Sequence, residues 1–204
     1  MFYDVTTITV APNAHIQALA PVENALKGAP RKGEFLACLY CDIGELNRVM
    51  LIHRYANEAD LAADRAAMVA ATDPFGLGDM CRGLSTDTFQ MFPFMAPLAP
   101  GQYGPVFEVR TYLFRPGGLT PTIPMWEQMV PGRAKLSPLI AAMHSVTGTV
   151  PRFMHIWPYP DLNTRAATRK TAIETKVWPP QGGAIYLETM RNDIFLPAAF
   201  SPIR

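Results

Sequence analysis

Arg48-Val49-Met50-Leu51-Ile52-His53-Arg54-Tyr55 and Arg152-Phe153-Met154-His155-Ile156-Trp157-Pro158-Tyr159 are the two stretches of sequence that decide the fold. Each is a short apolar run, which predicts a β-strand. In both runs, apolar residues occupy both sets of alternating positions. This pattern is typical of a strand that is covered on its two faces. A layer of helices can cover one face of the sheet, so the other face needs a second sheet.

The two stretches stand 104 positions apart, and the same offset matches residues along the whole chain. The matches include Val5 with Val109, Thr7 with Thr111, Pro12 with Pro116, Gly28 with Gly132, Ala62 with Ala166 and Pro93 with Pro197. This period is a domain length, and it is too long for a solenoid repeat. We therefore predict a tandem duplication, with repeats over 1–97 and 106–204 and a linker rich in Pro and Gly between them.

Both repeats carry the same predicted order of elements: strand, helix, strand, strand, helix, strand. Asn57 and Asp161 are the predicted N-caps of the second helices. The first helix of the second repeat carries Pro121, Pro124 and Pro131, and we expect Pro131 to end or kink it. The order predicts an α+β fold of two ferredoxin-like (βαββαβ) units. Packing of the two sheets face to face would form an α+β barrel within one chain. The predicted ranges are 3–10, 14–27, 35–41, 46–55, 59–71 and 85–92, then 106–114, the proline-containing helix, 139–145, 152–159, a helix after Asp161, and 184–192.

Composition excludes several classes of protein. The chain has 204 residues and a net charge of +1, so it lacks the basic surface expected of a nucleic-acid-binding protein. It contains no apolar stretch long enough to span a membrane and no visible secretory signal. Its three cysteines do not form a disulfide framework, and they favour a cytoplasmic location. Cys38 and Cys41 fall on opposite faces of a strand, so we predict no metal site. No glycine-rich nucleotide motif is present, and we predict no cofactor.

Several segments resemble the NIPSNAP family in order and spacing. Gly44–Tyr55 is similar to the family's G-x-L-N-x-V-x-x-x-W-x-Y segment, with His53 in place of Trp, whereas the second repeat keeps Trp157. The resemblance covers nearly the whole chain and implies the dimeric α+β barrel fold, which is shared with small cofactor-free monooxygenases and several binding proteins. It also implies that the Trp of the third strand points into the barrel. Further matching segments are Phe107–Tyr112, Pro116-Gly117, Ala63–Arg65, Ala167–Arg169, Asp73–Phe75, Leu196-Pro197 and Phe200–Pro202.

Strand alternation places most histidines of the chain, with tyrosine and tryptophan, on the faces that we expect to point into the barrel. A packing core would favour Leu, Ile and Val there, so we predict one asymmetric pocket for a small molecule. The candidate catalytic residues are His53 and His155, as general acid–base groups. The candidate ligand-binding residues are Tyr40, Tyr55, His144, Trp157 and Tyr159. The alternative interpretation treats these side chains as amphipathic fillers, each with one hydrogen-bond partner.

Two classes of function remain open. The first is binding or conversion of a small aromatic or apolar molecule inside the barrel, by chemistry similar to that of a cofactor-free oxygenase or an isomerase. The second is a non-catalytic assembly or interaction protein with a filled barrel. A cavity that reaches His53 or Trp157 would favour the first class. Because strand edges invite pairing, we also expect a homodimer.

Overall fold

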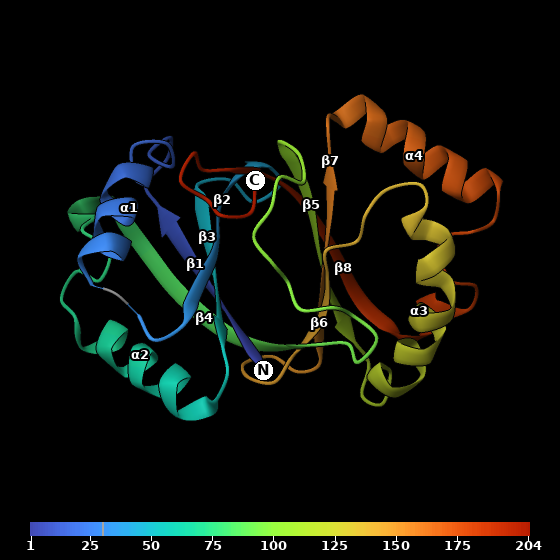
Figure 1. Cartoon of the computed structure of the whole chain (residues 1–204), viewed down its shortest axis with the longest axis horizontal. Helices are drawn as coiled ribbons and strands as arrows, with labels where there is room; N and C mark the ends of the chain where they lie inside the picture. Colours follow the sequence, from blue (N-terminus) through green and yellow to red (C-terminus); the bar gives the residue numbers. More distant parts are fainter. Residues whose placement is uncertain (30) are drawn as a thin grey trace. The chain divides into compact units, whose positions relative to one another are not determined.

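The computed structural model describes residues 1–29 and 31–204, and the observed elements follow the predicted order in both repeats (Figure 1). The fold class is α+β, as predicted. Within the described residues, no helix is long and apolar enough to cross a membrane. The first repeat contains β1 (Phe2–Val10), α1 (Leu19–Gly28), β2 (Glu34–Ile43), β3 (Arg48–Tyr55), α2 (Glu58–Ala70) and β4 (Cys81–Met91). The second contains β5 (Val106–Phe114), α3 (Leu119–Ala134), β6 (Ala141–Ser145), β7 (Arg152–Tyr159), α4 (Leu162–Glu174) and β8 (Leu187–Pro197).

The chain divides into two compact units. The first comprises residues 1–89, 99–102 and 195–204, and the second comprises 90–98 and 103–194. Each unit thus contains most of one repeat, together with the end of the last strand of the other repeat. The repeat boundaries at 1–97 and 106–204 stay a prediction from the sequence.

The sheets of the two units have the same strand order. In the first unit β1 pairs in antiparallel fashion with β3 and with β4, and β2 pairs with β3. The order is therefore β4-β1-β3-β2. In the second unit β7 pairs with β5 and with β6, and β8 lies next to β5, which makes the order β8-β5-β7-β6. This is the arrangement of a ferredoxin-like unit, and both helices of each unit lie on one face of its sheet (Figure 1).

Helix ends follow local chemistry. The side chain of Asn57 accepts a hydrogen bond from the Asp60 amide at 2.9 Å, and Asp161 accepts one from the Thr164 amide at 2.7 Å. Both predicted N-caps are confirmed. Of the two predicted effects of Pro131, an end of the helix is ruled out, because α3 continues to Ala134, and a kink stays a prediction. Proline removes one backbone donor but leaves the helix free to continue where a buried face holds it.

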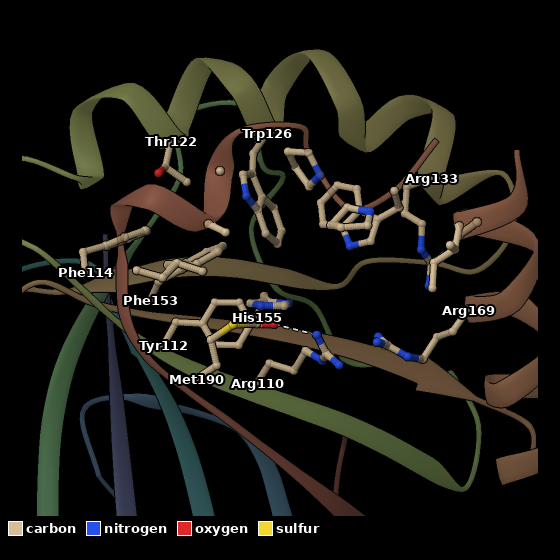
Figure 2. A pocket seen from close by; sticks show the side chains of 18 residues that line it. Arg110, Tyr112, Phe114, Thr122, Trp126, Arg133, Phe153, His155, Arg169 and Met190 are labelled. Atoms are coloured by element: carbon tan, nitrogen blue, oxygen red, sulfur yellow. Dashed lines mark hydrogen bonds between the residues drawn. The ribbon is translucent and has the colours of Figure 1, made fainter. Parts of the chain in front are cut away.

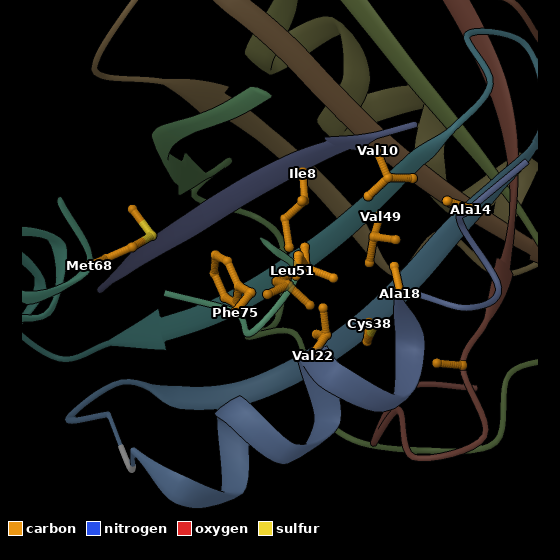
Figure 3. Packing of buried hydrophobic residues seen from close by; sticks show 12 residues of the cluster. Ile8, Val10, Ala14, Ala18, Val22, Cys38, Val49, Leu51, Met68 and Phe75 are labelled. Carbon is orange, nitrogen blue, oxygen red and sulfur yellow. The ribbon is translucent and has the colours of Figure 1, made fainter. Parts of the chain in front are cut away.

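The core of the first unit fills the space between its sheet and its helices. The side chains are small and aliphatic where the helices approach the strands (Figure 3). Such a close-packed cluster leaves little room for a ligand. Its buried members include Ile8, Val10, Ala14, Ala18, Val22, Cys38, Val49, Leu51, Met68, Phe75 and Leu77.

Candidate functional site

A cavity of about 270 Å³ lies in the second unit, between the sheet and helices α3 and α4. Aromatic rings form much of its lining (Figure 2). Met190 lines the cavity and is 60% exposed, so it stands at the rim. The aromatic and imidazole side chains are Tyr112, Phe114, Trp126, Phe153, His155 and Trp178, and the cationic side chains are Arg110, Arg133 and Arg169.

The cavity occupies the positions that are filled in the first unit. Eight members of the core cluster of the first unit have a partner 104 positions further on that lines the cavity. In most pairs an aliphatic side chain in the first unit is replaced by an aromatic or polar one. The pairs are Ile8 and Tyr112, Val10 and Phe114, Ala18 and Thr122, Val22 and Trp126, Val49 and Phe153, Leu51 and His155, Met68 and Ala172, and Phe75 and Pro179. The same strand and helix positions therefore build a packed core in one unit and a cavity in the other.

Trp126 of α3 is the centre of the aromatic wall. It is 5% exposed, and its ring centroid lies 4.5 Å from that of Phe153, 4.8 Å from that of His155 and 4.6 Å from that of Trp178. All three contacts are edge to face, which is a favoured geometry for aromatic pairs. These rings offer flat apolar surfaces to a ligand.

His155 of β7 lines the cavity and is 1% exposed. Its Nδ1 accepts a hydrogen bond from the Trp157 indole N–H at 2.7 Å. Burial, and then the positive charges of Arg110 and Arg169, lower the pKa of His155 well below its ordinary value. The imidazole is therefore neutral near pH 7 and carries its proton on Nε2.

Arg133 of α3 stabilises the wall behind the histidine. Its guanidinium carbon lies 4.4 Å from the centroid of the Trp157 ring, and it donates hydrogen bonds to the hydroxyls of Ser137 at 2.8 Å and Tyr159 at 2.9 Å. Trp157 and Tyr159 are thus held in place by Arg133, and neither side chain lines the cavity. Trp157 instead contacts the cavity through His155, to which it donates the indole N–H.

The remaining candidates from the sequence lie outside this cavity. His144 is half-buried beside Phe92, with ring centroids 6.2 Å apart, and burial lowers its pKa. Tyr40, His53 and Tyr55 belong to the first unit. Their roles in ligand binding stay predictions.

These three side chains have their own contacts in the first unit. Tyr40 stacks on His15 with ring centroids 5.8 Å apart, and the Tyr55 hydroxyl donates to Asp64 at 3.0 Å. His53 is 1% exposed, and burial followed by the charge of Arg31 lowers its pKa to about 3. His53 is therefore neutral at physiological pH.

The expectation that these strand faces point into the barrel is wrong. Leu51 of β3 packs in one cluster with Val22 of α1 and Met68 of α2, and His155 of β7 contacts Trp126 of α3. The face with His53, Tyr55, His155, Trp157 and Tyr159 is the helix-covered face of each sheet. The sequence could not decide between the faces, because both are apolar on these strands.

Sequence reasoning missed the cavity residues on the helices and after α4. Trp126, Trp178 and Arg169 line the cavity, but their segments showed no period that distinguished a ligand site from a core. The usable signal was the comparison of matched positions. At offset 104, Val22 corresponds to Trp126 and Ile8 corresponds to Tyr112. Among the described residues, no group of three or more His, Cys, Asp or Glu side chains is placed to hold a metal ion.

Comparison with known proteins identifies the family. The NIPSNAP family model matches residues 3–74 and 107–202, so the chain belongs to the NIPSNAP family. NipSnap homolog 3B of Mus musculus is 24% identical over 213 residues, which cover 100% of this chain and 86% of the mouse protein. NipSnap homolog 1 of Danio rerio is 24% identical over 115 residues, which are 55% of this chain and only 41% of the zebrafish protein.

A solved structure confirms the fold. The crystal structure of an anthrone oxidase-like protein superposes with a TM-score of 0.67 and 9% sequence identity, and the match covers 97% of this chain and 91% of that chain. The likeness confirms the predicted α+β barrel class.

Proposed function

We propose that this member of the NIPSNAP family binds a small aromatic or apolar molecule in the cavity of the second unit. The observation that carries the proposal is the replacement of a packed aliphatic core by an aromatic-lined cavity at matched positions. Selection for packing alone favours volume-conserving exchanges among aliphatic residues. The exchanges of Val22 for Trp126 and Leu51 for His155 instead change ring character and hydrogen-bonding capacity.

The size and lining of the cavity support this function. Small-molecule sites are concave and mostly apolar, with a few polar groups that orient the ligand. Here the edges of Trp126 and Trp178 and the ring of Phe153 supply the apolar walls, while His155 and the arginines supply the polar groups. A planar ligand would be stabilised by the rings and oriented by the donors.

The test measures the binding of 2-naphthol through the quenching of tryptophan fluorescence. Ala172→Met introduces the side chain that the first unit carries at the matched position, Met68, and reduces the cavity. We expect the variant to fold and to bind 2-naphthol at least tenfold more weakly. Ala66→Met, at an exposed position of α2, is the matched control and should bind as the parent does. Equal binding by the parent and Ala172→Met would contradict the proposed site.

A second candidate function is conversion of the bound molecule by cofactor-free oxygenase chemistry. It is supported by the likeness to the anthrone oxidase-like protein over 97% of this chain. The proposal is tested by measuring oxygen uptake on addition of 2-naphthol, with Ala172→Met as the control for the cavity. Uptake that is lost in the variant supports conversion, and saturable binding without uptake supports a binding protein. An isomerase is the related alternative, in which the ligand changes without oxygen uptake.

The assembly function remains the alternative from a different class. The packed core of the first unit is the feature that favours it. An assembly protein does not need a ligand-binding cavity. Failure of the parent to bind 2-naphthol would therefore favour the assembly function.

A further inference from the structure

One buried carboxylate in the second unit faces three arginines. Glu108 of β5 is 1% exposed. Its Oε1 lies 2.8 Å from Nε of Arg110, 2.6 Å from a terminal nitrogen of Arg165 and 3.7 Å from a terminal nitrogen of Arg169. Its Oε2 has no hydrogen-bond partner among the described residues. One negative charge therefore balances three positive charges that are themselves 13%, 21% and 33% exposed.

In the first unit, the carboxylate at the matched position, Asp4, faces one arginine, so the charges are equal. Asp4 pairs with Arg65 and accepts a hydrogen bond from the Thr86 hydroxyl at 2.7 Å. Two arginines of the second unit have uncharged residues at the matched positions, which are Thr6 for Arg110 and Leu61 for Arg165. The Asp4–Arg65 pair of the first unit corresponds to Glu108 and Arg169 of the second. The charge of Glu108 therefore compensates one arginine, as Asp4 does in the first unit. With three arginines and one carboxylate, the described residues of this cluster in the second unit carry a net charge of +2.

Two of the three arginines face the cavity. Arg110 and Arg169 line it, and Figure 2 shows their guanidinium groups pointing toward each other. Burial, and then the charge of Arg110, lower the pKa of Arg169, so the two cations are close enough to repel each other. The lining residues of the described structure include no carboxylate. An anion bound between the two arginines would relieve this repulsion.

His155 provides an independent sign of a ligand group. Because Nδ1 accepts the Trp157 N–H, the proton of the neutral ring is on Nε2. This Nε2 is buried and has no hydrogen-bond partner among residues 1–29 and 31–204. A buried donor without an acceptor is costly. His155, Arg110 and Arg169 line the same cavity, so the unpaired donor and the excess positive charge belong to one site.

We infer that the cavity takes an aromatic carboxylate, with the carboxylate oxygens against Arg110, Arg169 and Nε2–H of His155 and the ring among Trp126, Phe153 and Trp178. This inference rests on the proposed function and names the chemical class of its ligand. The planar guanidinium matches the planar carboxylate, and hydrogen bonds between charged groups are stronger than neutral ones. The imidazole supplies a neutral third donor.

The experiment compares two probes of the same shape on the unmodified protein. Titration calorimetry measures the binding of 2-naphthoate and of its neutral isostere 2-naphthamide. We expect 2-naphthoate to bind at least tenfold more tightly. Equal binding of the two probes, or tighter binding of the amide, would overturn the inference and leave the proposed function standing. Failure of both probes to bind would overturn the inference together with the proposed function.

Variants then locate the carboxylate. Arg169→Gln removes a cation that lines the cavity, and it should weaken 2-naphthoate binding about tenfold or more while changing 2-naphthamide binding less than threefold. Arg115→Gln is the control, since Arg115 is a cation of the same unit that is 63% exposed and lies outside the lining. It should leave both affinities unchanged. An equal effect of Arg169→Gln and Arg115→Gln on 2-naphthoate would overturn the assignment, and the probe pair on the parent decides the inference if Arg169→Gln does not fold.

Discussion

Glu108→Gln is the perturbation that separates the structural role of the arginine cluster from its role in binding. Glutamine keeps the shape and one acceptor oxygen, but it removes the only negative charge that faces Arg110, Arg165 and Arg169 among the described residues. Breaking a buried ion pair from one side costs about 3–5 kcal/mol, because the remaining charge stays buried without compensation. The arginines are partly exposed, so we expect a loss of about 3 kcal/mol in the free energy of unfolding.

Ligand should reverse part of this loss. Without Glu108, no carboxylate of the described residues pairs with Arg110 or Arg169, and a bound carboxylate would take its place. A tenfold gain in affinity for 2-naphthoate would stabilise the variant by about 1.4 kcal/mol more than it stabilises the parent at the same saturating concentration. Asp4→Asn is the matched change in the first unit. It should also destabilise the protein, but 2-naphthoate should not stabilise it more than the parent.

The assay is urea unfolding of parent, Glu108→Gln and Asp4→Asn, with and without 2-naphthoate.

The same unfolding measurements are repeated at a series of pH values. Burial acts to raise the pKa of Glu108, but the charges of Arg110 and Arg165 outweigh it, and the net pKa is lowered. The stability that the carboxylate contributes is therefore present above about pH 4.3, the ordinary Glu value, and is lost as the pH falls through the lowered folded value. The difference between parent and Glu108→Gln should shrink there. A loss below about 1 kcal/mol at pH 7, or equal stabilisation of parent and variant by the ligand, would refute the reasoning.

Three further predictions concern other parts of the molecule. Trp126→Val installs the residue of the matched position Val22, and it should lower the free energy of unfolding by about 3 kcal/mol because the cavity is enlarged. It should also abolish 2-naphthol binding. Urea unfolding and fluorescence titration measure the two effects, and unchanged stability would contradict the packing described. His53, with its pKa lowered to about 3, should show no titration of its ring resonances by NMR between pH 5 and 8. Its contribution to stability should be present above about pH 6.5 and fall as the pH drops below that value. A titration midpoint near 6.5 would show that the ring is not buried as described. The expected homodimer should sediment at about twice the chain mass of 22.5 kDa, and a single species at the chain mass would rule it out.

The fold could be predicted because its signals are local and occur twice. The paired strands Arg48–Tyr55 and Arg152–Tyr159 were predicted at nearly their observed limits, and the two N-caps were predicted from single side chains. The start of α1 was less predictable, since the helix begins at Leu19 rather than near Ala14. No side chain caps this end of the helix, so the sequence held no marker of the start.

The site was predictable only in part. Alternation placed His155 and Trp157 on one face of β7 correctly, but it could not tell which face the helices cover. It therefore assigned the site to the barrel interior. The tertiary partners of His155, namely Trp126 and Arg169, come from helices 29 residues before and 14 residues after it in the chain. Contacts of this kind depend on how helices pack on the sheet, which side-chain periodicity alone does not determine.

The most direct test of the central claim is the crystal structure of the protein with 2-naphthoate. We expect the naphthalene ring in the cavity between β7 and α3, edge-on to Trp126, with the carboxylate within hydrogen-bonding distance of Arg169 and Nε2 of His155. A ligand bound outside this cavity, or one seated in it with the carboxylate turned away from Arg110 and Arg169, would contradict the account.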